Sequence, residues 1–263
     1  MSALTTALGI TQRDLRRVRR QPSRLLGGIA RPFVWLLLVA TGYNSIAQLP
    51  SGLPYREFVY PGVLVMACLF GGALTAVSTV YDREFGMLRL MLASPAGAGA
   101  VLLGRALSAT VMGTTQALVV LAAAPFILDV SLLRLPLVLG ALVVASAVSA
   151  VLGLMVAARL RSVENFAGII NVLLFPLLFL SGALYPASRL PRPLALFASF
   201  NPVTHMVELV RRAFGQATEF SLAMNVGVLA GASVLAFALA TLLFDPEARL
   251  IGRPRPARGA AGP

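Results

Sequence analysis

Few residues in this 263-residue sequence could carry out chemistry. One His (His205) and one Cys (Cys68) are too few for a His or Cys cluster that binds a metal ion. A Ser–His pair would need a nucleophile elbow, and no GxSxG motif precedes a helix. All 22 basic residues are Arg, so the Lys with which a P-loop binds nucleotide phosphates is missing. The sequence therefore predicts a protein that is not an enzyme, with no cofactor of its own and any ATP site on another polypeptide.

Three polar residues in the last third of the chain share one face of a predicted helix. His205, Glu208 and Arg212 are spaced i, i+3 and i+7 after Asn201-Pro202, and Glu208 and Arg212 are predicted to form an i, i+4 ion pair. This set could be a polar lip that handles a substrate headgroup at an external exit. The alternative, which we favour, is a helix-stabilising pair on a wet surface.

The stretch YDREFGMLRLMLASP, residues 81–95, concentrates charge between two long apolar runs. A central Asp or Arg costs roughly 2.5–3.5 kcal/mol in a membrane helix. Asp82, Arg83 and Glu84 should therefore lie outside the hydrocarbon. The Leu and Met residues that follow favour a short amphipathic helix.

This short helix is the best candidate for a contact with another protein. We assign that contact to Glu84, Gly86, Arg89 and Pro95. Gly86 would let the chain leave the span, and Pro95 would stop the helix. The alternative is a plain connector, which would need no Leu and Met face.

Composition decides the fold class. The chain is 58% hydrophobic and only 12% charged, whereas about a quarter of a soluble domain is charged. Apolar runs of about 20 residues, the length of a membrane span, recur along it. We predict an all-α polytopic membrane protein with six transmembrane helices over residues 25–46, 58–80, 101–128, 135–157, 166–185 and 222–244. Arg31 falls near the start of the first span, where its side chain can snorkel to the headgroups.

The segments around the spans complete three predicted regions: residues 1–24, 25–244 and 245–263. Residues 1–24 should form an interfacial amphipathic helix against membrane lipid, with Leu4 and Leu8 on one face and Arg13 and Arg16 on the opposite face. The six-span region, 25–244, includes a Pro-rich but apolar segment over 186–220. That segment should form short external re-entrant helices, because irregular backbone does not face lipid. The tail should be disordered.

Charge sets the predicted orientation. The net charge of +12 could suggest nucleic-acid binding, but the Arg residues lie mostly at the ends of apolar runs, so topology explains them better. Most Arg residues outside the spans belong to the N-terminal segment, the 82–105 and 158–164 segments and the tail. The excess predicts that both termini and the 82–95 stretch are cytoplasmic.

Three motifs in chain order carry a family resemblance. In residues 60–95 the positions of a loose pattern, E-x-G-x-x-x-L-x-x-x-S-P, are occupied by Glu84, Gly86, Leu90, Ser94 and Pro95; Met87 stands where many members have Thr. The other two motifs are LSGALYPASRLP over 180–191 and NPVTHMVELVR over 201–211. With these motifs on a six-span frame, the sequence resembles the ABC type-2 permeases, the membrane subunits of bacterial ABC exporters of the drug-resistance and nodulation-export kind.

The resemblance implies partners and a mechanism. Such permeases form homo- or heterodimers on two P-loop ATPase subunits, which bind ATP and Mg²⁺, in the bacterial cytoplasmic (inner) membrane. Movement of the ATPases would pass through residues 82–95 as a coupling helix. We expect the first, second and fifth spans to line an apolar path for a hydrophobic or amphiphilic substrate such as a drug, lipid, glycolipid or polysaccharide. The alternatives are an energy-independent transporter or channel, and a membrane scaffold for an ATPase that transports nothing.

Overall fold

The computed structural model describes residues 3–20, 22–44, 52–92, 97–126 and 135–251. All regular secondary structure in these ranges is helical. The elements in chain order are α1 (Ala3–Arg19), α2 (Pro22–Val34), a π-helical segment (Trp35–Ala40), α3 (Thr41–Asn44), α4 (Tyr55–Glu84), α5 (Met87–Leu92), α6 (Gly97–Leu121), a 3₁₀ turn (Ala124–Phe126), α7 (Leu135–Ala157), α8 (Val163–Phe179), a 3₁₀ turn (Ala187–Arg189), α9 (Arg192–Phe200), α10 (Pro202–Ala213) and α11 (Leu222–Ile251).

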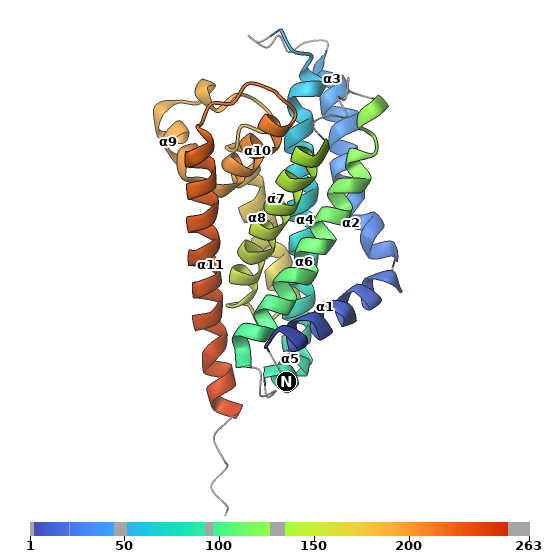
Figure 1. Ribbon diagram of the computed structural model, residues 1–263, viewed down its shortest axis with the longest axis vertical. Helices are drawn as coiled ribbons and strands as arrows, with labels where there is room; N and C mark the ends of the chain where they lie inside the picture. The colour runs from blue at the N-terminus through green and yellow to red at the C-terminus, as the bar shows by residue number, and fades with distance from the viewer. Residues whose placement is uncertain (1–2, 21, 45–51, 93–96, 127–134, 252–263) are drawn as a thin grey trace, which may run out of the picture.

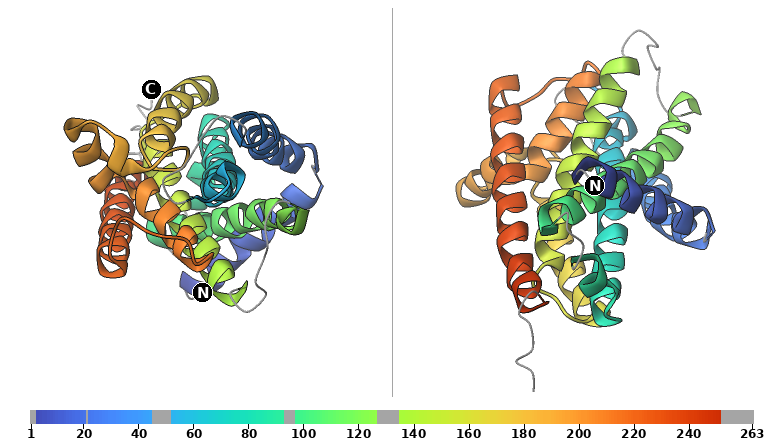
Figure 2. Two further views of the ribbon diagram at one scale, coloured as in Figure 1. Left: turned by 90° about the horizontal axis from the view of Figure 1, so that it is seen from above. Right: turned by 60° about the horizontal axis from the view of Figure 1, so that its bottom comes forward.

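Helix α4 is the central element of the bundle, and α2, α6, α7, α8 and α10 pack around it (Figures 1 and 2). Glycines let the helix backbones approach closely in this packing. A Cβ on Gly71 would lie only 2.4 Å from the Cα of Gly113 in α6. A Cβ on Gly72 would likewise lie 2.9 Å from the carbonyl oxygen of Ser149 in α7. Small residues let apolar helices pack backbone to backbone, which is how helices associate in lipid.

The prediction of an all-α membrane protein is confirmed in its coarse form. Within the described residues, four helical stretches are long and apolar enough to cross a membrane, over Tyr55–Glu84, Ala98–Phe126, Leu135–Ala157 and Leu222–Phe244. Two shorter apolar helices, Leu26–Ala40 and Val163–Phe179, lie where the first and fifth spans were predicted. The six-span topology therefore stays a prediction.

Two of the differences from the expected boundaries concern charged segments. Helix α4 continues through Asp82 and Arg83 to Glu84, so these charges are part of the long helix and not of a separate stretch. Helix α11 continues past Phe244 to Ile251, so the first part of the expected disordered tail is helical. The rest of the tail lies outside the described residues.

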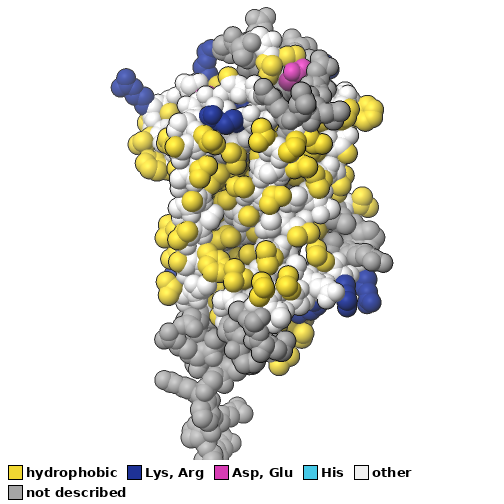
Figure 3. All heavy atoms as spheres, viewed as in Figure 1, with side chains coloured by type: hydrophobic (Ala, Val, Ile, Leu, Met, Phe, Trp, Pro, Cys, Tyr) yellow, Lys and Arg dark blue, Asp and Glu magenta, His cyan; other side chains and the backbone are white. Residues whose placement is uncertain are grey.

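The two ends of the bundle carry different short helices. Helices α1 and α5 lie at one end, together with the end of α11, and we call it the α5 end (Figure 1). Helices α3, α9 and α10 lie at the opposite end, so the Pro-rich 186–220 segment forms short helices as predicted. A broad apolar band crosses the face shown in Figure 3, with basic side chains near its two ends. This distribution fits a bundle that spans a membrane.

Helix α1 crosses the bundle near the α5 end and presents three distinct faces (Figure 1). Ala7 and Asp14 are buried against the bundle, and Ala7 lies close to Gly104 of α6. Leu4 and Leu8 are 66% and 53% exposed. The predicted Leu and Arg faces therefore leave a third, narrower face for packing on the protein, which fits a helix at a membrane interface.

Candidate functional site

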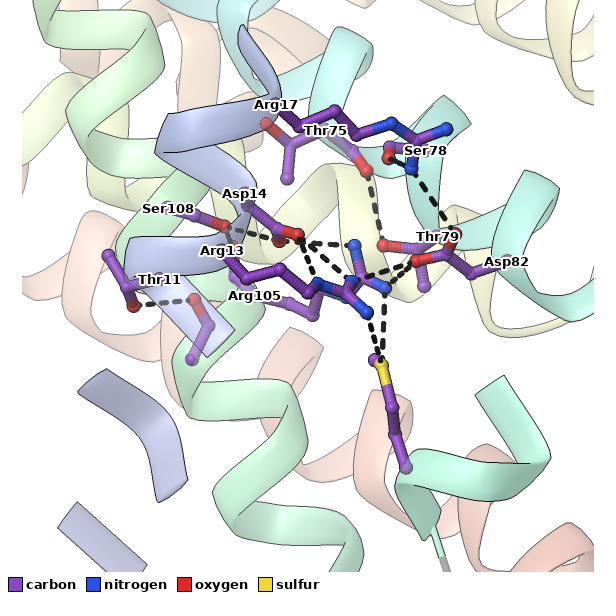
Figure 4. A network of polar contacts seen from close by, with 12 residues as sticks. Thr11, Arg13, Asp14, Arg17, Thr75, Ser78, Thr79, Asp82, Arg105 and Ser108 are labelled. Atoms are coloured by element: carbon purple, nitrogen blue, oxygen red, sulfur yellow. Dashed lines mark hydrogen bonds and ion pairs between the residues drawn. The ribbon is translucent and has the colours of Figure 1, made fainter. Parts of the chain in front are cut away.

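A largely buried network of charged residues joins three helices, α1, α4 and α6, at the α5 end (Figure 4). Arg105 of α6 is fully buried, and its guanidinium donates hydrogen bonds to Asp14 of α1, at 3.1 Å, and to Asp82 of α4. The hydroxyl of Ser108 also donates to Asp14, at 3.2 Å. Buried charges are tolerated only when paired and hydrogen-bonded, and both conditions are met here.

Two arginines of α1 complete this network. Arg13 contacts Asp14 at 3.0 Å and Asp82 at 3.1 Å, and Arg17 contacts Asp82 at 3.3 Å. Burial alone would lower the pKa of Arg13, but hydrogen bonds and charge attraction from the two carboxylates outweigh it and raise the pKa. Arg13 therefore stays charged throughout the physiological pH range. We call Arg13, Asp14, Arg17, Asp82 and Arg105 the polar joint.

The polar joint also reaches α5. The sulfur of Met91 accepts hydrogen bonds from Arg13, at 3.4 Å, and from Arg105, at 3.7 Å. Displacement of α5 would therefore act on α1, α4 and α6 together. Sequence reasoning missed Asp14 altogether and counted Arg105 only as a topological charge. The sequence did contain a signal for both residues, because Asp14 is the only acidic residue of α1 and Arg105 is the only basic residue of α6.

The last residues of α4 bind the turn between α7 and α8. Nη1 of Arg83 donates to the carbonyl oxygens of Ala157, at 2.8 Å, and Leu160, at 2.7 Å. The carboxylate of Glu84 accepts from the N–H of Val163, at 3.2 Å, in the first turn of α8. A cation near the end of α7 and an anion at the start of α8 both suit the helix dipoles. Glu84 thus links α4 mechanically to α8.

Gly86 makes the turn from α4 into α5, as its sequence position predicted. Its φ is +77°, in the left-handed region, and its N–H donates to the carbonyl of Arg83 at 3.1 Å. The predicted amphipathic helix follows as α5. Arg89 lies within α5, but its side chain is outside the described residues, as is Pro95. The contact assigned to Glu84, Gly86, Arg89 and Pro95 stays a prediction.

The two faces of α5 have opposite environments. Leu88 is buried and packs with Met91 in an apolar cluster that includes Val101 and Phe244. Leu90 on the other face is 70% exposed. Phe85, Met87 and Leu90 are all exposed apolar residues at this end of the bundle, and we call them the α5 outer face.

Replacing Gly86 by Ala should lower the free energy of unfolding by roughly 1–2 kcal/mol, because a Cβ disfavours the left-handed backbone. Thermal unfolding in detergent, followed by circular dichroism, measures the change. Gly99→Ala is the matched control, since Gly99 lies in α6 with open space around its Cβ position. An equal loss of stability in both variants would contradict this role of Gly86.

Two residues of the predicted exit lip, His205 and Glu208, are buried rather than on a wet surface, and Arg212 is half-buried. His205 is 0% and Glu208 is 3% exposed. The predicted pair of Glu208 with Arg212 is wrong, because Glu208 pairs with Arg211 at 3.2 Å. Arg212 instead donates to the hydroxyl of Thr218, at 2.7 Å.

These buried groups connect α10 to its neighbours. The second carboxylate oxygen of Glu208 accepts from the backbone N–H groups of Glu219 and Phe220, at 2.8 and 3.1 Å. Arg211 donates to the carbonyl of Gly182 at 2.9 Å. The ring nitrogens of His205 lie 2.7 Å from Oδ1 of Asn225 and 2.9 Å from the carbonyl of Ser199. This saturation supports a structural role, and the lip stays a prediction.

Comparison with known proteins matches this arrangement to one family. The sequence profile of the family described as "ABC-2 type transporter" matches residues 7–214, from α1 to the end of α10. Nodulation protein J of Rhizobium leguminosarum bv. viciae is 24% identical over 225 residues, covering 83% of this chain and 85% of that protein.

Two further relatives are named as transport permeases. The ycf38 protein of Cyanophora paradoxa is 28% identical over 214 residues, covering 77% of this chain and 71% of that protein. YbhR of Escherichia coli K12, named as a multidrug ABC transporter permease, is 26% identical over 216 residues, covering 79% of this chain and 55% of that protein. The chain therefore belongs to the ABC-2 type transporter family and is a membrane transport permease.

Proposed function

We propose that this chain is the transmembrane subunit of an ATP-binding-cassette exporter in the bacterial cytoplasmic membrane. It moves a hydrophobic or amphiphilic substrate outward, while two copies of a separate P-loop subunit bind and hydrolyse ATP with Mg²⁺. Two permease protomers form the path, and both termini of each protomer face the cytoplasm. The family membership and the names of the relatives support this proposal.

The observation that carries the proposal is the α5 outer face. Phe85, Met87 and Leu90 are 63%, 45% and 70% exposed at a bundle end that also carries the charges of the polar joint. An apolar patch rimmed by polar residues is typical of a protein–protein contact. We assign this end to the ATPase subunit, because permeases of this family work with ATP-binding subunits.

The contacts around α5 supply a route from the ATPase to the spans. Movement of α5 acts on α1, α4 and α6 through Met91 and the polar joint. The same movement reaches α8 through Glu84 at the end of α4. These links convert a push on one short helix into a concerted shift of several spans.

The proposed path runs along α2, α4 and α8, the positions of the predicted first, second and fifth spans. A cleft between the π-helical segment, α4 and α8 is apolar and includes Trp35, Met66, Phe175 and Phe179 in its lining. Val172 of α8 is 73% exposed. An apolar wall favours apolar or amphiphilic cargo, and the exposed face of α8 leaves room for a second protomer.

Replacing Leu90 by Ser tests the proposal. The variant should reduce the P-loop ATPase that co-purifies with the tagged chain from native membranes at least fivefold, because the centre of an apolar contact becomes polar. Leu196→Ser is the matched control, since Leu196 is 63% exposed on a short helix, α9, at the opposite end of the bundle. Quantitative mass spectrometry of the purified sample measures the ratio.

Four outcomes would contradict the proposal or one of its parts. A chain that purifies without any P-loop ATPase supports an energy-independent transporter or channel. Equal retention of the ATPase by Leu90→Ser and Leu196→Ser places the contact elsewhere. If Leu90→Ser releases the ATPase but transport in cells continues unchanged, the proposed coupling through α5 is wrong. If the chain binds the ATPase but deletion of the chain from cells changes no transport, the chain is a scaffold.

A further inference from the structure

Arg31 is an exposed charge at the middle depth of the bundle. Its guanidinium carbon lies 5.0 Å from the ring centroid of Phe70, near the midpoint of the 30-residue helix α4. At 1.5 Å per residue, Phe70 is roughly 20 Å from each end of that helix. The expectation that Arg31 snorkels to the headgroups from the start of the first span is therefore wrong.

Nothing in the described part of the chain neutralises this charge. Its one protein contact there is the ring of Phe70, with no ion pair or hydrogen bond. The sequence has no acid between Asp14 and Glu57, and none in α4 between Glu57 and Asp82. A second copy of this chain would also bring no carboxylate to this depth, because its acids lie at the span ends and in the connecting segments.

An unpaired guanidinium facing lipid tails is costly, so a charge at this depth normally faces water or a polar partner and marks a functional site. The position of Arg31 is held by neighbouring contacts. Gly28, one turn earlier in α2, lies so close to Gln116 of α6 that a Cβ would be 2.4 Å from its Nε2. Helix α2 therefore has little room to rotate and carry Arg31 away from the face that it shares with Phe70.

The surroundings of Arg31 are suited to an amphiphile. Trp35 is one helical turn further along from Arg31, and Met66 is one turn before Phe70 in the antiparallel α4. Both line the apolar cleft, together with Phe175 of α8. A cation thus lies about one helical turn from a narrow apolar cleft, and this pairing matches an anionic headgroup joined to an apolar body.

We propose that Arg31 binds the anionic group of the transported amphiphile, a phosphate, sulfate or carboxylate, while the apolar body lies along the apolar surface formed by Trp35, Met66 and Phe175. This inference rests on the proposed function, since it names the chemical class of the exported substrate. Arg suits the role because its planar guanidinium donates two parallel hydrogen bonds to such a group and keeps its charge in an apolar setting.

Trp35 is the only Trp in the sequence and so reports on this cleft directly. The purified full-length chain is reconstituted in liposomes of neutral phosphatidylcholine, and dibrominated phosphatidic acid or dibrominated phosphatidylcholine is included as quencher. We expect phosphatidic acid to quench Trp35 at a mole fraction about tenfold lower than phosphatidylcholine, and Arg31→Gln to abolish the difference. Arg16→Gln is the control that should preserve it, because Arg16 is an exposed residue of α1 away from the cleft.

Three results would overturn the inference. Equal quenching by the two lipids in the wild type shows that Arg31 does not select an anion. An unchanged preference in Arg31→Gln places the selection elsewhere. Reversal of the quenching by millimolar inorganic phosphate shows a site for small anions and not for an amphiphile. The quenching assay contains no ATPase, so a negative result in it does not affect the co-purification test with Leu90→Ser. A negative result in the co-purification test likewise does not affect the quenching assay.

Discussion

Replacing Arg105 by Met should lower the free energy of unfolding by about 3–5 kcal/mol, which is the usual cost of removing one partner from a buried ion pair. Arg105 is fully buried and bridges Asp14 and Asp82, whose side chains are only 10% and 6% exposed. Without Arg105, both carboxylates depend on the more exposed Arg13 and Arg17. Thermal unfolding in detergent and the yield of the chain in membranes measure the loss.

Arg17→Met is the control for this prediction, because it removes the same charge from the same carboxylate at a site that is 32% exposed. Its expected cost is under about 1 kcal/mol. Adding Asp82→Asn to Arg105→Met should restore part of the stability, since it removes a carboxylate left without its main partner. Equal losses in Arg105→Met and Arg17→Met, or strictly additive losses in the double variant, would show that the polar joint does not hold these helices together.

Replacing Glu208 by Ala should also cost about 3–5 kcal/mol. The change leaves Arg211, which is 3% exposed, without its charge partner, and it removes the acceptor of two backbone N–H groups in the 218–220 segment. Unsatisfied buried donors add to the loss. Thermal unfolding of the purified variant gives the magnitude.

Glu219→Ala removes an equal charge from an exposed position and should cost less than about 1 kcal/mol. Comparison of the two variants also tests the exit lip formed by His205, Glu208 and Arg212. If Glu208→Ala is as stable as the wild type but no longer transports, the lip interpretation is right and the structural role of Glu208 is wrong. A parallel loss of stability and transport supports the structural role.

Local pattern predicted the features that depend on neighbours in sequence. Hydropathy placed the fourth span over 135–157, where α7 is found. The turn at Gly86 and the amphipathic α5 also followed from short-range signals, since positive φ and helical periodicity are properties of a few consecutive residues. The short helices of 186–220 were predicted from composition, because a Pro-rich but apolar segment cannot present irregular backbone to lipid.

The pairing of charged side chains across the bundle could not be predicted from local spacing. Spacing predicted that Glu208 would pair with Arg212, but Arg212 is drawn to Thr218 and Phe220, and Glu208 meets Arg211. Asp14 and Arg105 are 91 positions apart, and no periodicity relates them. Their contact exists because α1 packs on α6 where Ala7 fits against Gly104.

The amino-acid sequence by itself determined that this protein is an all-α membrane permease of the ABC-2 kind without a P-loop Lys. Apolar run length, charge at the run ends and three ordered motifs are linear properties, so they can be read without coordinates. Only the tertiary structure decided which charges meet in the polar joint and that Arg31 lies beside Phe70 at mid-depth. Those facts depend on the register and rotation of helices distant in sequence, which close packing sets and hydropathy does not encode.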